Sequence, residues 1–249
     1  KELTVTRTGV TAFSDWAVFN TIATTTTLAT SASPAPVFTQ VAFTATVAPA
    51  TATGSVEFFA DGASLGTATL TAGKAQVATG DLTVGTHVIT ATLIPTGPYL
   101  ASSGTLAGGQ VIDKAATTVA LLSSLNPAPY SQAVTLTASV AISGMTAAGS
   151  VAAPTGQVRF SDESGELATV NLVDGVAAFA RDTWAVGTHT VTAEYLGDTL
   201  FAASTSPLAQ VVGKHGTATH LASAPNPAQA GQTVVMTATV EKQLSILTK

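Results

Sequence analysis

The sequence predicts an all-β protein whose tandem sandwich domains are joined end to end by short linkers. Three observations predict this class. Long blocks of sequence recur at domain-length intervals, apolar and polar residues alternate inside the blocks, and turn residues separate the alternating stretches. Thr, Val, Gly and Pro recur without any stretch of helical period, so helix is disfavoured almost everywhere.

The repetition is visible in two landmarks. One block occurs three times without gaps, as PAPVFTQVAFTATV (34–47), PAPYSQAVTLTASV (127–140) and PAQAGQTVVMTATV (227–240). A second landmark, VGTHVITATL (84–93), returns as VGTHTVTAEY (186–195). Repeat units of roughly a hundred residues are too long for a solenoid and suit whole domains.

These landmarks divide the chain into four segments. Residues 1–23 are expected to be the C-terminal strands of a preceding β domain, 24–114 the first complete domain, and 115–214 the second. Residues 215–249 are expected to be the incomplete start of a third domain. The second domain carries extra residues around 142–154, which predicts a longer loop there because insertions belong in loops.

Within each predicted domain, apolar residues fall on alternate positions. In the first domain the residues expected to face the core are Val41, Phe43, Ala45 and Val47. The residues between them, Ala42, Thr44 and Thr46, are expected on the opposite face. Side chains of a strand alternate between its two faces, so this pattern predicts a half-buried strand.

Further strands complete the set in each domain. One is expected before the Asp61-Gly62 turn, another through Ile89, Ala91 and Leu93, and the last strands of the two domains through Val111 and Val211. Seven or so short strands with a turn signal about every ten residues are typical of an immunoglobulin-like sandwich. The Cys-Trp-Cys pattern of antibody domains is absent from the sequence.

The motifs of both domains resemble the group 3 bacterial Ig-like domain. The residues that carry this resemblance are DGASLGTATL (61–70), PTGQVRF (154–160), VGTHTVTAEYLGD (186–198) and AQVV (209–212), and it covers about residues 24–240. The first domain departs from the family pattern at 93–97, where LIPTG replaces the tyrosine and Gly-Asp of the second. The resemblance implies extracellular stalks, adhesins and other large bacterial surface proteins, and it carries no family-wide catalytic residue.

Composition excludes several classes of function. Only 9% of the 249 residues are charged, the net charge is −5, and no basic run is present, so nucleic acid is not an expected partner. The chain has no Cys and therefore neither disulfides nor thiolate metal sites. Its longest apolar stretches are too short for a spanning helix, so no membrane insertion is expected in this segment.

Four histidines are candidates for metal binding or acid–base chemistry. His87 and His189 hold the same repeat position after a Gly-Thr pair, and this equivalence predicts a framework role in each domain. His215 and His220 are five residues apart, a spacing that places them on neither one strand face nor one helix face. No Ser-His-Asp order, phosphate loop or metal-spaced cluster occurs, so an enzyme is not expected.

One group of acidic residues in the second domain is a candidate for Ca²⁺, which needs several converging oxygens. Asp162, Glu163 and Glu166 lie in one predicted turn, and Asp198 lies in another loop of the same domain. The alternative interpretation, a solvated turn without metal, is favoured. No other cofactor is expected.

Three residues of the second domain are candidates for ligand contact. Tyr130 lies near the start of the domain, Met145 lies in the longer loop, and Trp184 precedes the VGTH landmark. Trp184 is expected to plug the core or its boundary, and a carbohydrate platform is the alternative.

Three functions are predicted, in order of preference. The first is a structural stalk or spacer of a bacterial cell-surface or secreted protein, in which the partners are neighbouring repeats of the same chain. The second is an adhesin whose loops in residues 115–214 contact a host or cell-surface glycan or protein. The third is a fibre subunit that self-associates by strand exchange at the incomplete ends.

Overall fold

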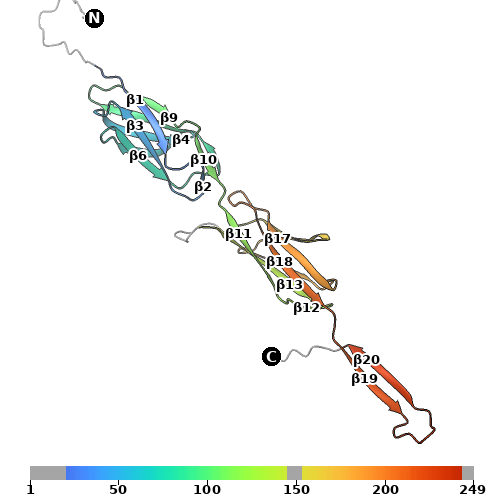
Figure 1. The fold of residues 1–249 in the computed structure, drawn as a ribbon. Helices are drawn as coiled ribbons and strands as arrows, with labels where there is room; N and C mark the ends of the chain where they lie inside the picture. The colour runs from blue at the N-terminus through green and yellow to red at the C-terminus, as the bar shows by residue number, and fades with distance from the viewer. Residues whose placement is uncertain (1–20, 145–152, 243–249) are drawn as a thin grey trace, which may run out of the picture. The chain divides into compact units, whose positions relative to one another are not determined.

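The computed structural model describes residues 21–144 and 153–242, and every element in these ranges is a β-strand. The chain divides into two compact units, unit 1 ending at Lys114 and unit 2 beginning at Ala115 (Figure 1). The all-β prediction is therefore confirmed. The C-terminal strands of a preceding domain are predicted within 1–23, and residues 1–20 of that range lie outside the described residues.

Unit 1 is a sandwich of short strands. Its elements are β1 (Thr25–Thr30), β2 (Ala35–Pro36), β3 (Val41–Ala48), β4 (Thr53–Ala60), β5 (Ala63–Thr69), β6 (Lys74–Thr79), β7 (Gly85–His87), β8 (Ile89–Thr96), β9 (Ser103–Thr105) and β10 (Gln110–Asp113). One layer has the order β1-β3-β6, and the other strands form the sheets β5-β4-β8-β9 and β2-β10-β7. The pairing of β2 with β10 is parallel, while the other pairs are antiparallel.

Unit 2 repeats this plan. Its elements are β11 (Thr117–Ser123), β12 (Ala128–Pro129), β13 (Val134–Ile142), β14 (Gln157–Asp162), β15 (Gly165–Asn171), β16 (Val176–Arg181), β17 (Gly187–Tyr195) and β18 (Ser204–Gly213). The two sheets have the orders β11-β13-β16 and β12-β18-β17-β14-β15. Here β12 pairs with β18 in parallel, as β2 does with β10 in unit 1.

The core of each unit is built by the alternating residues that the sequence predicts. On β3 the side chains of Val41, Phe43, Ala45 and Val47 are buried. On β8 those of Ile89, Ala91 and Leu93 are buried, and Val191, Ala193 and Tyr195 are buried at the equivalent positions of β17. Burying such side chains on both facing sheets supplies the main stabilisation of a sandwich.

The last strand of each unit runs through the predicted valine, but this valine is not the core residue of the strand. Val111 is half-buried and Val211 is exposed, so neither points into the sandwich. The buried positions are instead Ile112 on β10 and Val212 on β18. A buried glutamine, Gln110 or Gln210, lies two residues earlier on the same strand.

The two remaining strands of unit 2 pair with each other and belong to neither sandwich sheet. β19 (Thr217–Ala224) pairs in antiparallel register with β20 (Val235–Lys242), and they form a two-stranded sheet. Their large apolar residues Leu221, Val235, Met236 and Val240 are exposed in the described structure. The alternating sequence pattern of this repeat thus gives strands here, as it does in both units.

Candidate functional site

The hairpin turn between β4 and β5 places a carboxylate beside the first histidine. Asp61 and Gly62 form this turn with positive φ angles of 51° and 85°. An Asp-Gly pair is favoured in such a turn because both positions require left-handed backbone. The Asp61 side chain consequently reaches the end of β7, where His87 lies.

His87 contacts an oxygen atom at each ring nitrogen. Its Nδ1 lies 2.7 Å from Oδ2 of Asp61, and its Nε2 lies 2.7 Å from the carbonyl oxygen of Thr83. The second carboxylate oxygen of Asp61 accepts a hydrogen bond of 2.8 Å from the backbone N–H of Val88. The imidazole therefore connects the β4–β5 turn with the loop that precedes β7.

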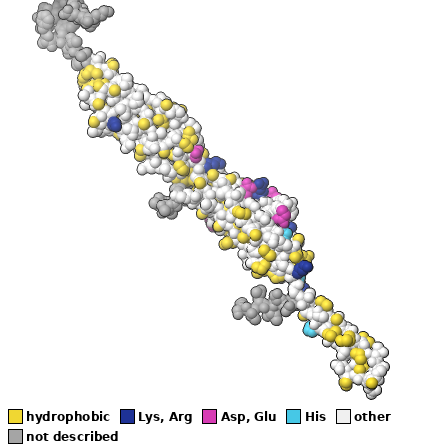
Figure 2. Space-filling view, in the orientation of Figure 1, with side chains coloured by type: hydrophobic (Ala, Val, Ile, Leu, Met, Phe, Trp, Pro, Cys, Tyr) yellow, Lys and Arg dark blue, Asp and Glu magenta, His cyan; other side chains and the backbone are white. Residues whose placement is uncertain are grey.

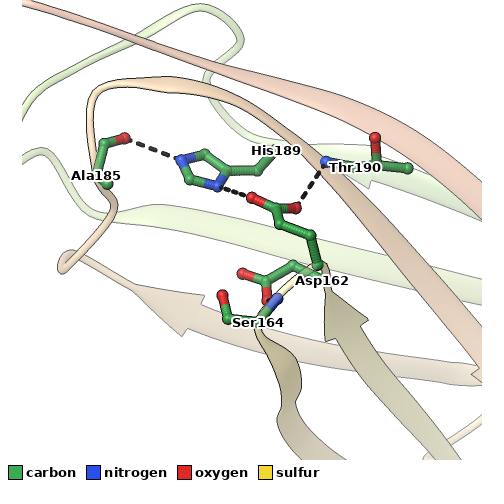
Figure 3. Close-up of polar contacts among 6 residues, drawn as sticks. Asp162, Ser164, Ala185, His189 and Thr190 are labelled. Atoms are coloured by element: carbon green, nitrogen blue, oxygen red, sulfur yellow. Dashed lines mark hydrogen bonds and ion pairs between the residues drawn. The ribbon is translucent and has the colours of Figure 1, made fainter.

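Unit 2 contains the same arrangement with a different carboxylate. Nδ1 of His189 lies 2.7 Å from Oε1 of Glu163, and Nε2 lies 2.9 Å from the carbonyl oxygen of Ala185 (Figure 3). Oε2 of Glu163 accepts a hydrogen bond of 3.2 Å from the N–H of Thr190. We call the triplets His87–Asp61–Thr83 and His189–Glu163–Ala185 the histidine clamps.

The clamp contacts shift the pKa values of their members. Hydrogen bonding to the Thr83 carbonyl raises the pKa of His87 against the effect of burial, and Asp61 raises it further. The Ala185 carbonyl raises the pKa of His189 in the same way, with further contributions from Glu163 and Asp162.

The carboxylates of the clamps shift in the opposite direction. The hydrogen bond from His87 lowers the pKa of Asp61, with a second contribution from the N–H of Val88. The pKa of Glu163 is lowered by its own backbone N–H and by His189. Both shifts favour a charged histidine facing a charged carboxylate.

The four residues predicted to hold Ca²⁺ do not lie in one place. Asp162 and Glu163 come together with His189, and their potential ligand atoms lie within 4.8 Å of one another. Oδ1 of Asp162 accepts a hydrogen bond from the N–H of Ser164, and Oε1 of Glu166 accepts one from the hydroxyl of Thr169. Because these oxygens already have protein donors, the turn is organised by its own hydrogen bonds, and a bound Ca²⁺ stays a prediction.

Asp198, the fourth residue of that set, organises a separate loop. Its carboxylate accepts hydrogen bonds from the N–H and hydroxyl of Thr155 and from the N–H groups of Leu200 and Phe201. Partial burial opposes the ionisation of Asp198, but these bonds outweigh it and lower its pKa to about 2. In unit 1 the corresponding contact is a hydroxyl pair, in which Thr96 donates to Thr53.

A buried glutamine in each unit was missed by sequence reasoning as a structural residue. The side chain of Gln110 accepts a hydrogen bond from the Thr30 hydroxyl and donates to the carbonyls of Ala32 and Val111. Both glutamines, Gln110 and Gln210, have 0% exposure. The available signal was their equivalent position in the QVIDK and QVVGK endings.

Gln210 makes the same three kinds of contact in unit 2. It accepts from the hydroxyl of Ser123 and donates to the carbonyls of Leu125 and Val211. All polar atoms of each amide thus have partners, as a buried amide requires.

Two of the three predicted contact residues line one hollow of unit 2. Trp184 is buried, donates its indole N–H to the carbonyl of Arg181 at 3.1 Å, and is stacked by the Arg181 guanidinium. This bears out its expected role as a plug. Tyr130 is 45% exposed and shares with Trp184 a shallow hollow of about 370 Å³, together with Ser131, Asp182, Thr183 and Ala185. Met145 lies outside the described residues.

Comparison with known families decides the identity of the two units. The family model of the bacterial Ig-like domain (group 3) matches residues 27–111 and 121–213, one match in each unit. The chain belongs to this family. Bacterial Ig-like domains of this group typically occur in extracellular bacterial proteins, and Ig-like folds are generally non-catalytic.

Several solved structures are similar to the chain at low sequence identity. The fibronectin(III)-like modules of Clostridium thermocellum CbhA are 16% identical, with 75% of this chain and 94% of that chain covered and a TM-score of 0.32. Murine CEACAM1b is 12% identical, with coverages of 75% and 99% and a TM-score of 0.31. At such low TM-scores these likenesses carry no functional inference.

A third similar structure belongs to a much longer chain. A beta-glycosidase from Bacteroides vulgatus is 12% identical, with 74% of this chain covered and a TM-score of 0.27. The Ig-like chain spans 24% of that protein's length. No curated protein matches the chain. In the described part of the molecule, no helix is long and apolar enough to cross a bilayer.

Proposed function

We propose that the two Ig-like units are structural spacer repeats of a bacterial cell-surface or secreted protein and that they catalyse no reaction. The observation that supports this is the recurrence of framework contacts. The histidine clamp and the buried glutamine occur in both units with the same geometry, whereas the loops differ. Features that two copies share in this chain therefore serve the fold of each copy.

The surface chemistry supports the same role. On the face shown in Figure 2, charged side chains are sparse among neutral ones, in line with the 9% of charged residues in the whole sequence. The connection between β10 and β11 contains only residues 114–116. A short connection limits the swing between consecutive domains, as a spacer requires.

Small-angle scattering of the full chain tests the spacer proposal. The expected result is the profile of an elongated particle, together with one cooperative unfolding transition for each unit in calorimetry. A profile typical of a compact globule would contradict it. A single transition that melts both units together would also count against serially joined, independent repeats.

The hollow beside Tyr130 supports a second candidate, an adhesin that contacts glycan. An exposed aromatic ring next to the Asp182 carboxylate and the hydroxyls of Ser131 and Thr183 offers stacking and hydrogen bonds to a sugar. The test is a glycan array with the wild-type chain and the variants Tyr130→Ala and Asp182→Ala. The adhesin proposal is supported if both variants lose glycan binding while the surface control Leu122→Ala keeps it. The proposal is overturned if both variants bind like the wild type.

The β19–β20 hairpin supports a third candidate, self-association into a fibre. Its exposed Leu221, Val235, Met236 and Val240 form apolar surface on a sheet that has two strands in the described structure. Sedimentation of the chain at high concentration tests this proposal. Oligomers that dissociate in the variant Met236→Lys support it, and monomers at every concentration overturn it.

A further inference from the structure

The clamp geometry restricts the protonation state of both histidines. A carbonyl oxygen can only accept a hydrogen bond, so Nε2 of His87 must carry a proton where it faces Thr83. An ionised carboxylate is also only an acceptor, so Nδ1 must carry a proton where it faces Asp61. A neutral imidazole has one N–H group, whereas the imidazolium ion has two. The imidazolium is therefore the form that satisfies both contacts.

The facing carboxylates are themselves held in the ionised form. The other oxygen of Asp61 accepts the N–H of Val88, and the other oxygen of Glu163 accepts the N–H of Thr190. Backbone N–H donors stabilise a carboxylate over a carboxylic acid. A neutral histidine receiving a proton from these carboxyl groups is consequently the less stable alternative.

We propose that each Ig-like unit binds one proton at its histidine clamp and that this proton fastens the loop before β7 or β17 to the neighbouring hairpin turn. When the imidazolium loses its proton, one of its two contacts loses its donor. The segments 81–86 in unit 1 and 183–188 in unit 2, each made of this loop and the first two residues of the strand, then become less firmly held. The protein thus contains two equivalent proton-binding sites that regulate local rigidity.

The charged surroundings of the two clamps differ. His87 faces the Asp61 carboxylate, and its register partner on β10 is the uncharged Gln110. His189 faces Glu163 and has Asp162 nearby, while its register partner on β18 is the uncharged Gln210.

An aromatic ring also contacts the clamp of unit 2. The Trp184 ring lies 5.3 Å from the His189 ring, and the Arg181 guanidinium covers that indole. The Glu163 and Asp162 carboxylates favour the imidazolium, and the Arg181 charge in turn lowers the pKa of Asp162.

The pKa directions define a pH window for the fastened state. Each histidine has a folded pKa above its ordinary value of 6.5, so its contribution is complete below 6.5 and is lost as pH rises through the folded pKa. Asp61 and Glu163 have folded pKa values below 3.8 and 4.5, so their contributions are present above those values and are lost as pH falls. Both partners contribute together between about 4.5 and 6.5.

Nitrogen-15 NMR of the imidazole rings in the full chain tests the protonation state. The probe is the proton itself, added by pH titration, with the urea-denatured chain as the reference. We expect both ring nitrogens of His87 and His189 to be protonated at about pH 5.5, and their pKa values to exceed those of the denatured chain. A single neutral tautomer at that pH, or pKa values at or below the denatured reference, overturns the proposal.

Matched variants separate the clamps from each other. Asp61→Asn keeps an oxygen acceptor and a residue type that tolerates the left-handed backbone at this position, so the variant is expected to fold. It should lower the pKa of His87 and leave that of His189 unchanged, and Glu163→Gln should do the reverse. If neither variant lowers the pKa of the histidine in its own clamp, the carboxylate does not hold the proton and the proposal fails.

Hydrogen exchange reports the rigidity itself. After correction for the intrinsic pH dependence of exchange, the amides of 81–86 and 183–188 should be better protected at about pH 5.5 than at about pH 8.5. In His87→Gln the pH dependence should vanish for 81–86 only. Equal protection at both pH values in the wild-type chain would show that the histidines are merely structural and would overturn the regulatory part.

Discussion

Thr155 donates two hydrogen bonds to one carboxylate oxygen of Asp198, from its N–H at 2.9 Å and from its hydroxyl at 2.6 Å. The second oxygen accepts the N–H groups of Leu200 and Phe201, each at 2.8 Å. One carboxylate therefore joins the start of β14 to the loop after β17. Unit 1 replaces it with a threonine pair, so the loop has no equivalent charge there.

Replacing this carboxylate should make unit 2 less stable in a pH-dependent way. With a folded pKa of about 2 against an ordinary 3.8, Asp198 contributes at most about 2 kcal/mol above pH 3.8, and this is lost as pH falls towards 2. Urea unfolding of Asp198→Asn at neutral pH measures the loss. The exposed Asp182→Asn is the control; equal stability of the two variants would contradict the assignment.

Removing the buried amide of unit 1 should destabilise that unit. Gln110→Ala removes a fully buried amide and its hydrogen bonds to the half-buried Thr30 and Val111 and to the exposed Ala32. Water reaches part of these groups, and the Thr30 hydroxyl still donates to the Ala32 carbonyl, so we expect a loss of about 1–2 kcal/mol in denaturant unfolding.

An exposed glutamine of the same unit is the control for this experiment. Gln76 makes one hydrogen bond, to the Thr44 hydroxyl. Its replacement by Ala should change the free energy of unfolding by no more than about 0.5 kcal/mol. A similar small effect in Gln110→Ala would show that water replaces the amide.

A glycine of β4 is required by close backbone approach. Gly54 has a φ of 134°, and a Cβ there would lie 2.2 Å from the carbonyl oxygen of Ile94. Gly54→Ala must therefore separate β4 from β8, at an expected cost of more than about 2 kcal/mol. The control Gly80→Ala has its nearest contact at 3.9 Å. Thermal unfolding distinguishes them, and equal melting temperatures would contradict the argument.

Replacing the buried Trp184 by a smaller residue should lower the free energy of unfolding of unit 2. Trp184→Ala removes a side chain that is 2% exposed, for an expected loss of about 3–5 kcal/mol. Trp184→Phe should cost less because it refills part of the volume. A Trp184→Ala variant that unfolds like the wild type would instead indicate a surface platform for ligand.

Much of the sandwich could be predicted because β-strand side chains alternate. Phe43 and Leu93 are buried where the alternation places them, since one face of each strand packs on the core. The last strands run through Val111 and Val211 as predicted, but a buried glutamine holds the inward position before each valine. Hydrophobic patterning cannot reveal a buried amide, because that amide is stable only through partners supplied by a distant strand.

Only part of the candidate site could be predicted from the sequence. The equivalence of His87 and His189 indicated a framework role, which the clamps bear out. Their carboxylate partners were not identified, because Asp61 and Glu163 differ in type and lie 26 residues before their histidines. Such long-range pairing depends on how the hairpin turn folds back beside β7 or β17.

The parallel pairing of β2 with β10 has a mechanical consequence. Ala35 and Pro36 lie beside Ile112 and Asp113, near the start and the end of unit 1. When tension is applied to the two ends of such a unit, parallel strands slide in shear, so their hydrogen bonds are loaded together rather than unzipped one by one. On β10, Gln110 also binds the carbonyl of Ala32, which precedes β2. Unit 2 repeats the arrangement with β12, β18 and the contact of Gln210 with Leu125.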